Sequence, residues 1–119
     1  MAKKTLKQCN KRIGKIIDAM IDLSRANLQV KGRQYARSGQ VDRLGQFDKA
    51  ASLQGCNPGQ ACYGMMAKHL TTLSDYVNDP AGVSLGQWEE KIGDSITYLL
   101  LLMAIEITRF EPEGADENE

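Results

Sequence analysis

The sequence predicts an all-α protein, a bundle of three long helices and one short helix that assembles into an oligomer. Helical apolar spacing near the N-terminus, two helix-start patterns in the second half and a long apolar run close to the C-terminus support this prediction. At 119 residues with 42% apolar content, the chain fits one domain with a core of its own. We assign residues 1–110 to a single helical domain, and the acidic residues 111–119 to a disordered tail.

The first predicted helix covers residues 5–28. Its apolar residues follow one another at spacings of 3, 4, 3, 4 and 3, which makes a narrow apolar stripe that should pack against another helix of the bundle. The stretch 31–45 contains three glycines and no sustained period, so it is predicted to be a loop, and a short helix over about 46–53 follows. The stripe consists of Leu6, Cys9, Ile13, Ile16, Met20 and Leu23.

The third predicted helix begins at Asn57 and ends near residue 77. Asn57 is a favourable N-cap, Pro58 suits the first helical position, and Gln60 can complete a capping box with the cap residue. His69 lies on the apolar side of this helix, where it is either a hydrogen-bonded core or interface residue or a ligand. A polar strip formed by Lys68, Thr72 and Asp75 runs beside that side.

The last predicted helix covers residues 85–109, with Ser84 and Gln87 as its capping box. Between residues 98 and 107 it is apolar on nearly every side, which suggests burial between protomers, and a charge at Leu101 is expected to abolish assembly. We therefore expect a homo-oligomer that forms through this helix. The expected core stripe of the helix consists of Ile92, Ile96, Leu99, Met103 and Ile107.

Cysteine content and charge limit the cellular setting. Three cysteines without metal-ligand spacing predict a reduced, cytoplasmic protein, and the apolar run 96–107 is shorter than the roughly 20 residues that a membrane span needs, so we expect no membrane partner. Residues 1–43 hold eleven basic and three acidic residues, whereas residues 44–119 hold four basic and twelve acidic ones. Two halves that neutralise each other are favoured over a nucleic-acid surface, because residues 1–34 lack aromatic residues for base stacking.

Two groups of charged residues are candidates for a site. Glu90, Asp94 and Tyr98 are spaced i, i+4, i+8 along one side of the last helix, where two carboxylates could share a divalent cation. Alternatively, Glu90 complements the helix dipole together with its neighbour Glu89. Arg33 and Arg43, in or beside the glycine-bearing stretch, could bind phosphate oxygens or simply be solvated. No P-loop sequence or serine-hydrolase element is present.

Several of these segments together resemble a known group of proteins. The resemblance is to small phage proteins that are similar in outline to the MazG-like all-α nucleoside triphosphate pyrophosphatases and to the phage nucleotide-modification-associated domain. It covers roughly residues 31–107. The segments that carry it are Tyr35, Asp42-Arg43-Leu44, Phe47-Asp48-Lys49-Ala50-Ala51, Lys68-His69, Glu90-Lys91-Ile92-Gly93-Asp94 and Tyr98-Leu99.

This resemblance implies a dimeric or tetrameric bundle of about four helices that hydrolyses a nucleotide with the help of magnesium. It implies Glu90 and Asp94 as catalytic residues, and these two with Asp75 as metal ligands. Lys91 stands where such a site has glutamate, so the set of metal ligands is incomplete. The candidate phosphate-binding residues are the two arginines named above, Arg33 and Arg43, together with Lys68 and His69.

Two functions follow from these observations. The first is a nucleotide-handling protein, either a pyrophosphohydrolase or a binder with a degenerate metal site, whose ligand is a nucleotide or another phosphate-bearing small molecule. The alternative is a non-enzymatic oligomeric protein that binds a host or phage partner.

Overall fold

The computed structural model describes residues 5–34 and 44–111, and side chains up to residue 30 in the first of these ranges. These residues form four helices and no strand: α1 (Leu6–Gln34), α2 (Gly45–Gln54), α3 (Pro58–Asn78) and α4 (Leu85–Phe110). The predicted all-α class with three long helices and one short helix is therefore confirmed. The predicted tail over residues 111–119 lies, apart from its first residue, outside the described residues.

Local sequence explains where α3 and α4 begin. The Asn57 side chain accepts a hydrogen bond from the backbone N–H of Gln60 at 2.8 Å, and the Gln60 side chain accepts one from the backbone N–H of Asn57 at 3.0 Å. Ser84 and Gln87 exchange the same pair of bonds at 3.1 and 2.8 Å. Both capping boxes satisfy amides that the first helical turn leaves without partners, as the sequence predicted.

One helix is longer than the sequence predicted. α1 continues to Gln34, so the predicted loop over 31–45 is wrong for its first four residues, and residues 35–43 lie outside the described part of the chain. Gly32 costs a helix only about 1 kcal/mol relative to alanine, and good helix formers such as Lys31 and Arg33 flank it. The partly buried side chain of Leu28 also holds this end of α1 against the core.

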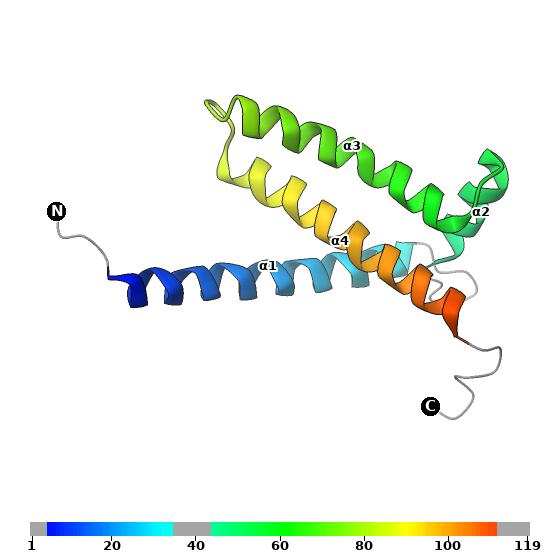
Figure 1. Cartoon of the computed structure of the whole chain (residues 1–119), viewed down its shortest axis with the longest axis horizontal. Helices are drawn as coiled ribbons and strands as arrows, with labels where there is room; N and C mark the ends of the chain where they lie inside the picture. The colour runs from blue at the N-terminus through cyan, green and yellow to red at the C-terminus, as the bar shows by residue number, and fades with distance from the viewer. Residues whose placement is uncertain (1–4, 35–43, 112–119) are drawn as a thin grey trace.

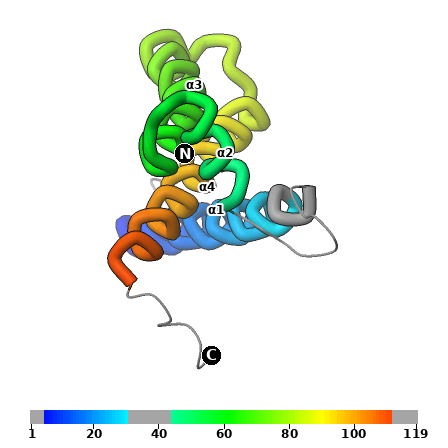
Figure 2. Tube along the Cα trace, turned by 90° about the vertical axis from the view of Figure 1, so that its right-hand side faces the viewer, coloured from blue at the N-terminus to red at the C-terminus, as the bar shows by residue number. Residues whose placement is uncertain are grey.

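Helices α3 and α4 form an antiparallel pair, and α1 packs against α4 (Figure 1). Viewed from the side, α3, α4 and α1 lie as successive layers, with α2 across the start of α3 (Figure 2). α1 crosses α4 near Gly93, where a Cβ atom would lie 3.7 Å from atoms of both Met20 and Leu23. Thr97, one turn after Gly93, is completely buried.

The core is small and includes residues from all four helices. Burial raises the pKa of the Cys62 thiol above its ordinary value of 9.0, so this side chain stays protonated and acts as a core residue. Its thiol donates a hydrogen bond to the backbone carbonyl of Tyr98 at 3.6 Å, which ties α3 to α4. The buried residues of the cluster are Phe47, Cys62, Leu101 and Ile105, and partly buried residues around them are Leu28, Leu44, Met65, Tyr98 and Leu102.

The predicted core stripe of the last helix is wrong. Ile92, Leu99, Met103 and Ile107 are exposed, and Ile96 is only partly buried. α3 packs instead on the side of α4 that carries Leu101 and Ile105. Because this helix is apolar almost all round, its sequence offers more than one face that could be buried, and packing decides between them.

The apolar stripe of α1 is covered along only part of its length. Its second half, around Met20 and Leu23, meets α4 near Gly93. Its first half projects beyond α4 (Figure 1), and Leu6, Ile13 and Ile16 are exposed. The expected packing of this stripe against a bundle helix is therefore only partly realised within one chain. None of the helices over the described ranges has the length and apolarity that crossing a membrane requires.

Candidate functional site

The candidate site is a group of three side chains at the contact between α3 and α4. His69 of α3 places its Nδ1 atom 3.6 Å from a carboxylate oxygen of Asp94 on α4. The two side chains are 19% and 22% exposed, so solvent reaches the pair but screens it less than a surface pair. The separation is that of an ion pair when the imidazole is protonated, and it exceeds the usual length of a hydrogen bond.

Tyr98 connects this pair to the core. Its ring stacks on the imidazole of His69, with 5.3 Å between ring centroids and 27° between the planes. Because Tyr98 follows Asp94 by one helical turn, both side chains meet the same residue of α3. The ring also packs against the core cluster. The backbone carbonyl of Tyr98 accepts the hydrogen bond from the thiol of Cys62. The three side chains, which we call the His69 cluster, are therefore held by packed parts of two helices.

Register explains why these residues meet. In the antiparallel pair, Tyr76 near the end of α3 packs edge-on against Trp88 near the start of α4, at 5.3 Å between centroids. His69 lies two helical turns before Tyr76 on α3. Because the two helices are antiparallel, it lies opposite residues 94 and 98, which follow Trp88 by about two turns on α4. The sequence placed His69 on the apolar side of its helix and Asp94 with Tyr98 on one side of the other. It could not show that the two sides face each other.

The other predicted acidic residues do not join this group. Glu90 and Asp75 are exposed. Within the described ranges, no three histidine, cysteine, aspartate or glutamate side chains lie close enough together to hold a metal ion. The predicted ligand set Glu90, Asp94 and Asp75 is thus not brought together as a group of three.

The predicted phosphate-binding residues have different positions. Lys68 precedes His69 on α3, and its side chain is exposed. His69 itself faces a carboxylate, so its charge is already balanced when the imidazole is protonated. Arg33 is in the last turn of α1, where side chains are not described, and Arg43 lies outside the described residues.

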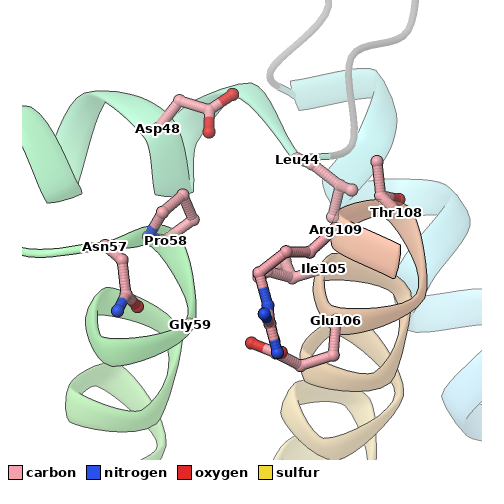
Figure 3. Close-up of a pocket in the computed structure, with 9 residues that line it drawn as sticks. All are labelled: Leu44, Asp48, Asn57, Pro58, Gly59, Ile105, Glu106, Thr108 and Arg109. Atoms are coloured by element: carbon pink, nitrogen blue, oxygen red, sulfur yellow. The ribbon is translucent and has the colours of Figure 1, made fainter. Parts of the chain in front are cut away.

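A pocket that the sequence did not indicate lies where α3 begins and α4 ends. It has a volume of about 450 Å³, and the Glu106 carboxylate reaches across it from α4 to the start of α3 (Figure 3). A Cβ atom on Gly59 would lie only 2.8 Å from that carboxylate, so the absence of a side chain there permits the close approach. The pocket is lined by Leu44, Asp48, Asn57, Pro58, Gly59, Ile105, Glu106, Thr108 and Arg109.

The negative charge of Glu106 already has favourable partners inside this pocket. The carboxylate lies beside the first turn of α3, where the helix dipole favours an anion. Arg109 also donates a hydrogen bond from Nε to Glu106 at 2.8 Å. The charge of Glu106 is therefore balanced within the pocket without a ligand. Asn57 and Pro58 identified the helix start in the sequence, but nothing local predicted that Glu106 would face it.

Comparison with known proteins adds no further assignment: no protein-family model, curated protein or solved structure matches this chain.

Proposed function

We propose that this chain binds a nucleotide, or another phosphate-bearing small molecule, beside the His69 cluster. One observation supports the proposal most: His69 and Asp94, separated by 25 positions in the sequence, approach to 3.6 Å across two helices. The segments that contain them are also two of those that resemble nucleotide-handling phage proteins.

Each side chain of the cluster has a chemical role in this proposal. The carboxylate of Asp94, 3.6 Å from Nδ1 of His69, orients the imidazole, and an imidazole that carries a proton can donate a hydrogen bond to a phosphate oxygen. Lys68 adds a second positive charge on the adjacent exposed surface. Tyr98 fixes the plane of the imidazole by stacking on it. Hydrolysis of the bound ligand would require the other protonation state of His69, because only a neutral imidazole can accept a proton from water.

The binding prediction concerns Asp94→Asn, which keeps the size of the side chain and removes its charge. We expect nucleotide affinity to fall about tenfold or more, because His69 loses the carboxylate that orients it toward the ligand, and a charge-assisted hydrogen bond to phosphate contributes about 1.5–3 kcal/mol. Isothermal titration calorimetry with nucleoside mono-, di- and triphosphates, with and without magnesium, measures this loss. Glu89→Gln is the matched control, since Glu89 is exposed on the same helix and loses the same charge.

The outcomes separate a ligand site from a structural ion pair. An ion pair that only fastens α3 to α4 would lower the thermal stability of Asp94→Asn without changing ligand affinity. The absence of heat with every nucleotide, or equal affinities for wild type and Asp94→Asn, would contradict the proposal. The proposal requires a weaker complex in a variant whose circular dichroism shows intact helices.

A second candidate function is that of a non-enzymatic oligomeric interaction protein. The specific observation in its favour is the row of exposed apolar side chains on α4, including Leu99 and Met103. Leu101, where a charge was expected to disrupt assembly, is only 7% exposed and packs in the core of its own chain. A charge there would unfold the protomer, so Met103 is the informative position. This function predicts that Asp94→Ala leaves partner binding and assembly intact.

A further inference from the structure

Exposed apolar side chains gather on two surfaces of α1 and α4 within the described residues. One is the first half of the α1 stripe, and the other is the outer face of α4, away from α3. Soluble monomers rarely expose contiguous apolar patches larger than a few hundred Å². The residues of the two surfaces are Leu6, Ile13, Ile16 and Ile17 on α1, and Ile92, Leu99, Met103, Ile107 and Phe110 on α4.

The two surfaces continue a contact that the chain already makes. Ile13 and Ile16 lie on the same stripe as Met20 and Leu23, which meet α4 near Gly93. That stripe already fits a surface of α4 in its second half. The first half of the stripe continues at the same spacing, and its side chains are exposed, so a second helix could pack on them in the same way.

Charge distribution favours a second copy of this chain as the occupant. The basic residues of the first half of α1, such as Lys7, Lys11 and Lys15, lie on the side opposite its apolar stripe, so an approaching helix does not meet them directly. α1 (Leu6–Gln34) holds seven basic and two acidic residues, whereas α4 (Leu85–Phe110) holds two basic and four acidic residues. When α1 of one copy lies over α4 of another, segments of opposite charge come together.

We infer that two copies of this chain associate through these surfaces, with α1 lying across two α4 helices. Its second half, around Met20 and Leu23, packs on α4 of its own chain, as the structure shows. Its first half, around Ile13 and Ile16, packs on α4 of the second copy. The outer face of α4 in one copy packs on the outer face of α4 in the other. A two-fold axis relates the copies, so each α1 makes the same contacts with the other copy. This arrangement covers both surfaces at once and does not depend on the proposed nucleotide site.

Sedimentation equilibrium of the full chain over a wide range of protein concentration tests the inference. We expect a species of twice the chain mass of 13.2 kDa. Ile16→Glu on α1 and Met103→Glu on α4 should each weaken association at least 30-fold, because each places a charge in an apolar contact. Both side chains are more than half exposed, at 53% and 57%, so the protomer should keep its fold, which circular dichroism checks. Gln8→Glu, also exposed on α1, is the control for an added charge.

Every other outcome contradicts the inference. A monomer at all concentrations shows that the surfaces do not bind a second copy, and binding of that monomer to anionic phosphatidylglycerol vesicles would identify a lipid surface as the occupant. Association that survives either glutamate variant shows that a different surface is used. Because His69 and Asp94 are not among the substituted residues, nucleotide affinity can be measured separately in the same variants.

Discussion

Replacing Phe47 with alanine should lower the free energy of unfolding by about 3–5 kcal/mol, the range for removing a buried aromatic ring. Phe47 is completely buried, and its cluster includes Cys62 of α3 and Leu101 of α4. The ring therefore joins the short helix to the long helical pair. A small domain has a total stability of only about 5–15 kcal/mol, so this variant should approach complete unfolding at physiological temperature.

Urea denaturation followed by circular dichroism and by the fluorescence of Trp88 measures the loss. Trp88 is the only tryptophan of the chain and packs against Tyr76 at the far end of the α3–α4 pair, so it reports the packing of that end. Leu53→Ala is the control, because Leu53 belongs to the same short helix but is largely exposed. A change of less than about 1 kcal/mol for Phe47→Ala would show that α2 does not share the core.

The second large effect is expected at Gly93, where α1 crosses α4. A Cβ atom there would lie 3.7 Å from Leu23 and from Met20, which is ordinary van der Waals contact, so alanine should fit. The longer side chain of leucine would overlap these residues. Gly93→Leu should cost about 1–3 kcal/mol, although leucine favours a helix more than glycine does.

The pair of substitutions separates helix propensity from packing. Gly93→Ala should leave the free energy of unfolding unchanged or raise it by up to about 1 kcal/mol. Urea denaturation of both variants gives the two values. Equal stability of the leucine and alanine variants would mean that α1 does not cross α4 at this position.

Local signals in the sequence predicted the helices well. Asn57 with Gln60 and Ser84 with Gln87 set two helix starts through bonds between residues three positions apart. Such signals need no knowledge of the rest of the molecule. Thr5 and Gln8 form a third capping box of this kind at the start of α1, and the sequence prediction did not include it.

Packing was harder to predict, because it depends on contacts between distant segments. The apolar stripe through Leu99 and Met103 was expected in the core and is exposed, since α3 binds another side of the same helix. Asp94 was identified as a candidate from its spacing with Glu90 and Tyr98 on one side of its helix. Its partner could not be deduced, because His69 belongs to a different helix and the register between the two helices is a tertiary property.

The imidazole of His69 offers the most direct test of the proposed site, because it is the only histidine of the chain. Its ring protons give a single set of nuclear magnetic resonance signals that can be followed while a nucleotide is added. Binding beside the His69 cluster predicts that these signals move with increasing nucleotide, reach a plateau and move less in Asp94→Asn at the same concentrations. Signals that stay in place for the folded wild-type protein, with every nucleotide added to high concentration, would contradict the proposed function.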